Sequence, residues 1–405
     1  MVSHSLFSLI HEVNKLVYKN VPESEVWEPS SMDPKSLQVL QRAVRKLGAA
    51  LETPGDTVQR IGYLGVQQTA VRIGIDLDIF NMLADARETG KTVSELATAS
   101  GADPALLVRI LRYLASIDVV DQIGLDRYKG NSISKALTVR ELVAGIKVEY
   151  DLCNQTVMKL PFYLAKTKYK NPENPADGPF NFGFKSEEPF FQWIMRPENL
   201  YHLPIFSDWM IGQRIGRISW LDMFPVEEQL SLGFSGEKDA VMIVDVAGAS
   251  GSEMKDLKKR YPSFPGRLIL QDLPQAIEQI NKLTVDFETM DYNFFSPQPV
   301  IGARAYYFRQ IFHDWNDEKC GEILKHTAEA MTPGYSKIII NDMVVPDIGA
   351  GVVACQLDIV MMSMLSAKER TESEWRELLD SSGYKILKIW TGDETTESVI
   401  EAMLK

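Results

Sequence analysis

The sequence predicts an α/β protein in which a parallel, doubly wound sheet follows a helical region that ends in a winged helix. From residue 240 onward, continuous apolar strands alternate with helices, the pattern of a parallel sheet covered on both faces. Between residues 68 and 131 the order is helix, short helix, longer helix and hairpin, which is typical of a winged helix-turn-helix. A chain of 405 residues is also too long for one ordinary domain. We expect three regions, over residues 1–140, 141–235 and 236–405.

Composition limits the partners and the compartment. The net charge is −12 and no block of Lys and Arg interrupts it, which argues against nucleic acid or an anionic membrane as a partner. Cys153, Cys320 and Cys355 lie far apart, so they offer neither a disulfide framework nor a metal-binding spacing. The N-terminus reads as an amphipathic helix and not as a signal peptide, and no apolar run is long enough to span a bilayer. We expect a cytoplasmic protein without a bound metal.

The first region predicts helices around a polar, proline-containing stretch over residues 20–36, then a helix over 68–86. Thr92 can cap a short helix that holds Glu95, and Asp103 with Pro104 can start a longer one. The stretch "GLDRYKGN" predicts a hairpin. The longer helix carries only two arginines and is mostly apolar, so we expect it to pack against a partner chain in a homodimer. A transcription factor, with the larger domain as its sensor, is the alternative.

The middle region is rich in aromatic residues and proline. Residues 171–184 predict a loop, and residues 187–212 predict a helix. Trp209 and its apolar neighbours on that helix are either ordinary core or the wall of a pocket for a flat apolar ligand. The sequence does not separate these two interpretations.

In the third region, the strands are "VMIVDVAG", "RLILQDLP", a third that ends at Asp291, then "AYYFRQIFH" and "SKIIINDMVVP", with final strands over residues 385–391 and 397–404. Helices are expected over residues 252–262, 317–331, 355–365 and 371–383. Ligands of such sheets bind beyond the carboxyl ends of the strands. The residues that end each strand are therefore the first candidates for a site.

Acidic residues and a small-residue turn occupy three of these strand ends. Asp245 is followed by small residues that include Gly248 and Gly251, although the three glycines of a dinucleotide fingerprint are missing. A small-residue loop that merely packs helix on strand is the alternative. Asp272 is well placed to accept hydrogen bonds from ribose hydroxyls, and Asp291 ends the third strand. With no P-loop lysine, this rim favours a cationic, nucleoside-containing ligand with few phosphates.

His313 ends the fourth strand, at the edge where this architecture places chemistry. Imidazole gains and loses a proton near neutral pH, which suits a general base. A base needs an orienting partner, and Asp342 and Glu369 are the available carboxylates. A structural role for His313, and a surface or capping role for either acid, are the alternatives.

These stretches together resemble the metal-independent, class I S-adenosylmethionine-dependent O-methyltransferases of fungi and plants. The resemblance runs from about residue 60 to the C-terminus and is strongest in "RLILQDLP", "HDWNDEKC", "KIIINDMVVPD" and "AKERT". It implies a Rossmann-like methyltransferase sheet, a winged-helix module that forms a homodimer, and S-adenosyl-L-methionine as cofactor with S-adenosyl-L-homocysteine as its product. It further implies that His313 deprotonates the acceptor hydroxyl between two acids, Asp342 (where plant relatives often carry Glu) and Glu369.

The resemblance also implies the remaining site residues. The cofactor is expected to contact the strand ends, and the acceptor a pocket next to the base. The expected cofactor-binding residues are Asp245, Gly248, Gly251, Asp272, Leu273, Asp291, Tyr292 and Arg309. The expected pocket residues are Trp209, Asp314, Met361 and Met364, of which the methionines are equally compatible with core packing.

One departure from the family concerns the first loop. The family's motif usually reads D-x-G-x-G-x-G, and this chain has Ala247 and Ala249 at the first two glycines. Alanine tolerates positive φ poorly and adds a methyl near the cofactor. We expect a slightly shifted loop that still binds the cofactor, and a reduced cofactor affinity is the alternative.

The expected reaction is methyl transfer to a phenolic or enolic hydroxyl of a small aromatic or polyketide secondary metabolite. The alternative keeps the fold and the cofactor without transferring the methyl, as in fungal members of this family that act as pericyclases or dehydratases. The sequence does not reveal the acceptor.

Overall fold

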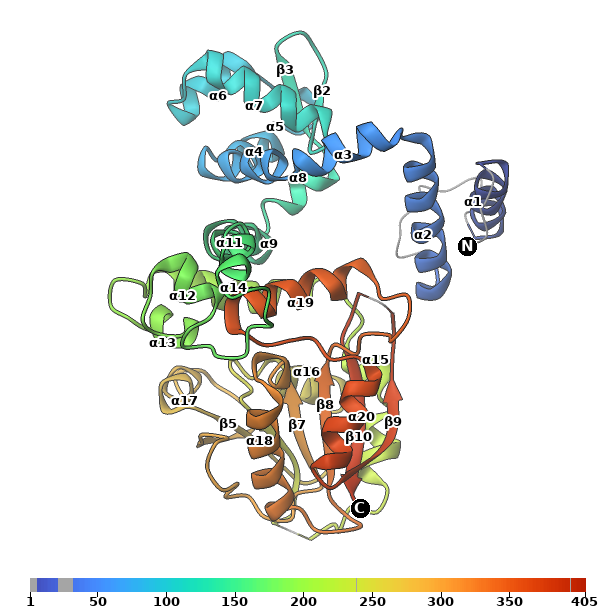
Figure 1. Cartoon of the computed structure of the whole chain (residues 1–405), viewed down its shortest axis with the longest axis vertical. Helices are drawn as coiled ribbons and strands as arrows, with labels where there is room; N and C mark the ends of the chain where they lie inside the picture. Colours follow the sequence, from blue (N-terminus) through green and yellow to red (C-terminus); the bar gives the residue numbers. More distant parts are fainter. Residues whose placement is uncertain (1–5, 21–31, 238, 394) are drawn as a thin grey trace. The chain divides into compact units, whose positions relative to one another are not determined.

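The computed structural model describes residues 6–20, 32–237, 239–393 and 395–405, and the chain divides into two compact units (Figure 1). The first unit holds Met1–Gln155 and Phe191–Ile215, and the second holds Thr156–Phe190 and Gly216–Lys405. Residues 141–235 are therefore shared between the two units. Most of the polar stretch expected over residues 20–36 lies outside the described residues. Within the described ranges, no helix combines the length and apolar character needed to cross a membrane.

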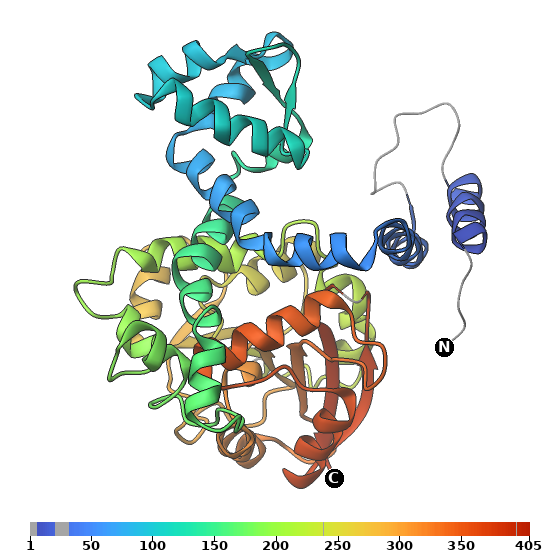
Figure 2. The same ribbon diagram turned by 45° about the horizontal axis from the view of Figure 1, so that its top comes forward.

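The first unit is helical with one small sheet. Its helices are α1 (Leu6–Asn20), α2 (Pro34–Leu51), α3 (Pro54–Gly62), α4 (Leu64–Asp76), α5 (Ile79–Ala86), η2 (Arg87–Thr89), α6 (Val93–Ser100), α7 (Pro104–Ser116), α8 (Ser132–Ala136), α9 (Arg140–Val148), the π-helix η3 (Glu149–Cys153), α13 (Phe190–Ile194) and α14 (His202–Gly212). Its strands β1 (Lys91–Thr92), β2 (Val120–Gln122) and β3 (Arg127–Gly130) form an antiparallel sheet in the order β1-β3-β2. Figure 2 shows this winged helix from a second direction.

The local start signals of the winged helix are confirmed. The Thr92 hydroxyl accepts a hydrogen bond from the Glu95 backbone N–H at 3.2 Å, and the Glu95 carboxylate accepts one from the Thr92 N–H at 2.6 Å. The Asp103 carboxylate accepts from the N–H groups of residues 105 and 106 at the start of α7. Both caps satisfy N–H groups that a helix leaves without a partner at its start.

The apolar face of α7 packs inside its own unit. Leu107, Leu111 and Leu114 are fully buried in a cluster with residues of α4, α5 and α6. A small helical core therefore accounts for these three leucines, while Leu106 on the same helix is exposed, and the expected packing of α7 against a partner chain stays a prediction.

The second unit is built on a seven-stranded sheet. Its strands are β4 (Val241–Val246), β5 (Arg267–Asp272), β6 (Glu288–Asp291), β7 (Ala305–Arg309), β8 (Lys337–Asp342), β9 (Tyr384–Trp390) and β10 (Ser398–Leu404). The order is β6-β5-β4-β7-β8-β10-β9, and the first five strands are parallel. β10 runs antiparallel to both neighbours. The sheet is thus not wholly parallel, because residues 391–397 are too short for the crossover that a parallel return requires.

Helices cover both faces of this sheet (Figure 1). The helices of this unit are α10 (Asn154–Val157), α11 (Leu160–Lys166), α12 (Pro179–Phe184), α15 (Trp220–Met223), the π-helix η4 (Glu227–Ser231), α16 (Ser252–Arg260), α17 (Pro274–Ile280), η5 (Phe312–Asp314), α18 (Asp317–Ala330), α19 (Val352–Leu365) and α20 (Glu372–Ser381). One core cluster joins β4, β7 and β8 to α18 and α20, and another joins the same strands to α15 and α16. The doubly wound layering expected from the apolar strands is confirmed.

Two expectations for the middle region are wrong. The expected loop over residues 171–184 ends in α12, which begins at Pro179, where proline's fixed φ favours a helix start. The helix expected over residues 187–212 is broken into α13 and α14. Pro197 lies in the break, and it lacks the N–H that a continuous helix needs.

Candidate functional site

The sheet register brings the expected acids to one edge. Asp272, which ends β5, pairs with Asp291, which ends β6. Arg309 at the end of β7 pairs with Asn341 of β8, one residue before Asp342. Because these strands are parallel, their carboxyl ends and the loops that follow them share that edge.

The ring of His313 is fixed by a carboxylate from a distant loop. Contrary to expectation, His313 does not end a strand, because β7 stops at Arg309; it lies in the following helical turn η5 and is 7% exposed. Its Nδ1 lies 2.7 Å from Oε1 of Glu369, which is buried and follows α19. A carboxylate accepts at that distance, so Nδ1 carries the proton and donates it, which leaves Nε2 of the neutral ring as the basic nitrogen. The surface and capping alternatives for Glu369 are wrong, and Glu374 supplies the capping box of α20 instead.

Two further acids surround the imidazole. Asp314 Oδ1 lies 3.5 Å from Nε2 of His313. Asp342 accepts the backbone N–H of Phe312 at 3.2 Å through Oδ2, and its Oδ1 is buried without a hydrogen bond among the described residues. Glu369, not Asp342, therefore orients the ring, while Asp342 holds the backbone of the turn.

The charges of this cluster shift its titration. Burial lowers the pKa of His313, but the negative charges of Glu369 and Asp314 outweigh it and raise that pKa to about 10. Burial raises the pKa of Asp342 to about 7, with His313 opposing the rise and Glu369 adding to it. Burial also raises the pKa of Asp314 to about 6, against the opposing charge of His313. With a pKa of about 10, the imidazole of the cofactor-free protein holds both protons at neutral pH. It can act as a base only where a nearby cation lowers that pKa, which the positive charge of a bound cationic ligand would do.

The loop after β4 keeps a glycine-like backbone at its alanines. Ala247 has φ +59° and Ala249 has φ +45°. In place of the shifted loop expected from the sequence, the structure has both alanines in the left-handed region, which L-residues disfavour. At Gly248 an added Cβ would lie 2.5 Å from Oδ2 of Asp245, and at Gly251 it would lie 2.6 Å from the ring of Phe287. The two glycines are required by close packing.

Asp272 is tied to that loop. Its Oδ2 accepts the N–H of Ala249 at 2.8 Å and its Oδ1 accepts the N–H of Leu273 at 2.7 Å. Burial raises the pKa of Asp272, and these two backbone hydrogen bonds oppose the rise. The carboxylate expected to bind ribose therefore also fixes the distance between the ends of β4 and β5.

A second acidic cluster lies behind the loop. Asp245 is buried, and burial raises its pKa well above the usual range, with the carboxylates of Glu253 and Asp272 adding to the rise. Arg309 lies 2.7 Å from Glu397 and 3.6 Å from Glu253. A cationic ligand beside Asp245 would oppose this rise and stabilise the charged form of the carboxylate.

The other expected residues lie as follows. Asp291 is exposed, Leu273 is 50% exposed, and the Tyr292 hydroxyl donates to the Ser296 carbonyl at 2.9 Å. On α19, Met361 is half-buried, while Met364 is buried and its sulfur accepts from the Thr156 hydroxyl at 3.3 Å.

Trp209 belongs to the first unit, where its ring fills the space beside Gly145 of α9. Its expected place in the acceptor pocket stays a prediction.

Sequence reasoning missed three charged residues of the second unit: Glu253, Arg370 and Glu397. Glu253 follows the small-residue loop in the first turn of α16, and Arg370 stands inside the "AKERT" stretch. Both residues could therefore have been predicted from their position beside motifs of the site. Glu397 stands beside Arg309 through the antiparallel return of β10, and no local pattern marks it.

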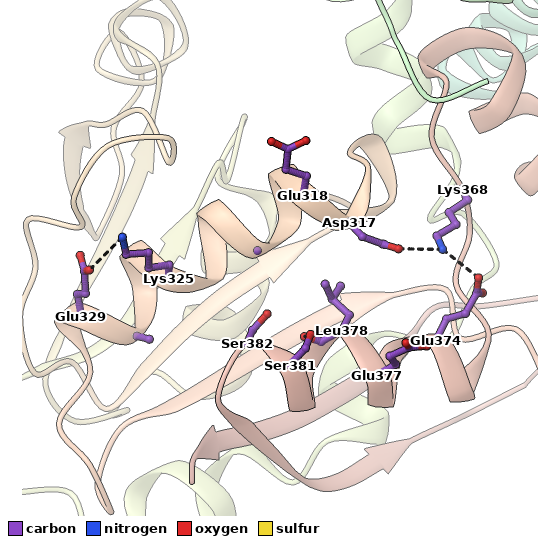
Figure 3. Close-up of a pocket in the computed structure, with 12 residues that line it drawn as sticks. Asp317, Glu318, Lys325, Glu329, Lys368, Glu374, Glu377, Leu378, Ser381 and Ser382 are labelled. Carbon is purple, nitrogen blue, oxygen red and sulfur yellow. Dashed lines mark hydrogen bonds and ion pairs between the residues drawn. The ribbon is translucent and has the colours of Figure 1, made fainter. Parts of the chain in front are cut away.

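Two cavities of the second unit lie away from this cluster. A groove of about 670 Å³ between α18 and α20 is lined by Asp317, Lys368 and Glu374 among others (Figure 3). Another, of about 630 Å³, lies at the amino ends of β4 and β5. Neither includes His313. Within the described ranges, no group of three or more His, Cys, Asp or Glu residues is arranged to hold a metal ion.

Two family models match the chain. An O-methyltransferase domain matches residues 234–385, and an O-methyltransferase dimerisation domain matches residues 66–140. Among curated relatives, Methyltransferase cfoC of Aspergillus candidus is 40% identical over 369 residues, which cover 91% of this chain and 90% of the relative. Demethylsterigmatocystin 6-O-methyltransferase of Aspergillus parasiticus is 33% identical over 90% of this chain and 92% of its own length.

Solved structures agree. A structure described as a pericyclic reaction enzyme matches with a TM-score of 0.87 and 30% identity, covering 98% of this chain and all of that one. LepI in complex with SAM matches with a TM-score of 0.86 and 30% identity, covering 99% of this chain and all of the other. The model matches, the identities and the strand-edge site agree that this chain belongs to the S-adenosylmethionine-dependent O-methyltransferase family, whose fungal members serve secondary metabolism.

Proposed function

We propose that this enzyme transfers a methyl group to a phenolic or enolic hydroxyl of a small aromatic or polyketide metabolite, with His313 as the general base. The observation that carries the proposal is the 2.7 Å contact between Nδ1 of His313 and Oε1 of Glu369. This contact fixes the tautomer of the ring and leaves Nε2 to accept a proton.

The strand-edge residues fit S-adenosyl-L-methionine. Asp245 has a buried carboxylate oxygen, Oδ2, without a hydrogen bond among the described residues, and Gly248 has no room for a Cβ. Asp272 and Asp291 would hold the nucleoside, and Gly248 and Gly251 would let the backbone approach it. When bound, the cofactor supplies an activated methyl group on a sulfonium, and S-adenosyl-L-homocysteine is its product. The acidic surroundings of Asp245 favour such a cation.

The chain's own contribution is proton transfer and positioning. A phenol ionises near pH ~10, so it is a poor nucleophile at neutral pH. Nε2 of His313 takes the hydroxyl proton, and Glu369 stabilises the imidazolium that forms, because the two already share a hydrogen bond. A positioned base contributes roughly 10²–10⁴-fold to such a rate.

The binding partners are inferred from the relatives and the family models. The relative named as demethylsterigmatocystin 6-O-methyltransferase supports a small-molecule acceptor oxygen, although its own substrate is not carried over. We also infer a cytoplasmic homodimer that forms through residues 66–140, the range of the dimerisation domain. Light scattering of the full chain at micromolar concentration tests the dimer, and a monomer mass would refute it.

Methyl transfer is tested with labelled S-adenosyl-L-methionine and a panel of phenols and enols. The wild type should produce a labelled product and S-adenosyl-L-homocysteine. His313→Ala should lower kcat by about 10²–10⁴-fold while cofactor binding by calorimetry persists. If cofactor binding disappears in that variant, His313 is structural and the proposal fails.

A second candidate is a reaction of the bound substrate without methyl transfer, such as a pericyclic reaction or dehydration. The observation in its favour is the likeness to a structure described as a pericyclic reaction enzyme, at 30% identity over nearly the whole chain. Product mass separates the two candidates. Methyl transfer adds one methylene and consumes the cofactor, whereas the alternative gives an isomer or a dehydrated product with the cofactor unspent.

A further inference from the structure

Arg370 is a fully buried cation, 1% exposed, directly after Glu369. Its Nη1 donates to the Phe312 carbonyl at 2.7 Å, and its Nη2 donates to the Trp315 carbonyl at 2.9 Å. Its Nε and Nη2 both donate to Oδ1 of Asp317, at 2.9 and 2.7 Å. A buried guanidinium is costly unless such hydrogen bonds satisfy it.

The two carbonyls lie on either side of the general base. Phe312 precedes His313, and Trp315 follows Asp314, so the planar guanidinium spans the ends of the turn that carries the imidazole. On the opposite side of the same turn, the Phe312 N–H donates to Asp342. Arg370 also contacts the segment that follows β8, since its own carbonyl accepts the Val345 N–H at 3.0 Å.

Glu369 and Arg370 therefore act on one turn through adjacent positions. Glu369 holds the ring of His313, and Arg370 holds the backbone at both ends of η5. A lysine would supply the charge but not the fork that bridges two carbonyls. The only carboxylate bonded to Arg370 among the described residues is Asp317, whose side chain is 56% exposed on the groove of Figure 3.

We propose that Arg370 is a positioning residue for the general base, which keeps the turn Phe312–Trp315 in the one register that lets His313 meet Glu369. This rests on the proposed role of His313 in proton transfer. The alternative is that Arg370 only stabilises the start of α18 through Asp317, in which case its loss would leave the imidazole unchanged.

The test uses the titration of His313, which requires no acceptor. The full chain is labelled at its five histidines, and the His313 ring signal is assigned by its absence in His313→Gln. In Arg370→Gln we expect the apparent pKa of His313 to fall by on the order of 1 unit or more. Binding of S-adenosyl-L-homocysteine should stay within about threefold of the wild type, since threefold is under 1 kcal/mol.

Arg370→Lys separates geometry from charge, and we expect it to resemble Arg370→Gln. Arg376→Gln is the matched control, because this α20 arginine is ion-paired with Glu372 on the surface. The control should leave the His313 titration unchanged. A wild-type titration in either folded Arg370 variant overturns the proposal.

If Arg370→Gln does not fold, Asp317→Asn replaces it as the test. That substitution removes the carboxylate partner from a half-exposed position, and a smaller shift in the same direction is expected. An unchanged titration there also overturns the proposal. Full turnover by His313→Ala would instead refute the proposed base without moving this readout, so the two failures are distinguishable.

Discussion

Replacing Ala247 and Ala249 by glycine should stabilise the second unit. Their φ angles of +59° and +45° lie in the left-handed region, which costs an L-residue about 1–2 kcal/mol at each position. Glycine removes that cost but increases the entropy of the unfolded chain, by about 0.4–1 kcal/mol per site. Ala247 also packs against the core, so losing its methyl takes back part of the gain. We expect a net gain of about 1 kcal/mol for the double variant.

The assay is urea unfolding of the full chain, followed by hydrogen exchange in peptides of β4 and β5. These peptides report the second unit separately, which matters because a chain of two units need not unfold in one step. The matched control is Ala328→Gly inside α18, which should lose about 1 kcal/mol because the helix interior disfavours glycine. The double glycine variant is thus expected to raise the free energy of unfolding, and the control is expected to lower it. If the double variant loses as much stability as the control, the inference that Ala247 and Ala249 strain this loop is refuted.

Three further predictions concern the site. Gly248→Ala would place a Cβ 2.5 Å from Oδ2 of Asp245, so it should lower the free energy of unfolding by about 1–3 kcal/mol and abolish cofactor binding in calorimetry. The control is Gly321→Ala in α18, where an added Cβ would meet nothing within 4 Å; it should raise the free energy of unfolding by about 0.5–1 kcal/mol. The raised pKa values of Asp342 (about 7) and His313 (about 10) mean that the folded protein binds more protons than the unfolded chain. The melting temperature of the cofactor-free protein should therefore fall as the pH rises from about 4 to 10. In His313→Gln, the melting temperature should depend less on pH above about pH 6.5. A wild-type melting temperature that does not change with pH would contradict this prediction. Binding of the cationic S-adenosyl-L-methionine should release more protons than binding of S-adenosyl-L-homocysteine, measured by calorimetry in buffers of different ionisation enthalpy, and equal release would count against the acidic site.

The elements that the sequence predicts correctly are those with local causes. Thr92 and Asp103 cap their helices through neighbouring N–H groups, and the strand that ends in Asp272 and the strand that precedes His313 are short apolar runs. Residues that end neighbouring parallel strands can then be placed close together from the sequence alone, because the carboxyl ends of parallel strands lie at the same edge of the sheet.

The features that escaped prediction depend on contacts between distant segments. Asp342 and Glu369 were equally available to His313 in the sequence, and only the folded loop after α19 shows that Glu369 takes Nδ1. Arg370 lay inside a quoted motif, but its carbonyl partners at residues 312 and 315 are invisible before folding. The left-handed φ of Ala247 opposes its local preference, and surrounding packing decides such cases.

The energetics of the buried pair bear on the choice between methyl transfer and a charge-assisted rearrangement. Removing an imidazolium and a carboxylate from water costs several kcal/mol each, and apolar residues in their place are often neutral or stabilising. A rearrangement that uses only a fixed positive charge and a shaped cavity gains nothing from His313 and Glu369 in the interior. Proton removal from a hydroxyl does need a base whose tautomer is fixed. The buried hydrogen bond between them therefore favours a reaction that removes a proton, such as the proposed methyl transfer, over a rearrangement without proton transfer.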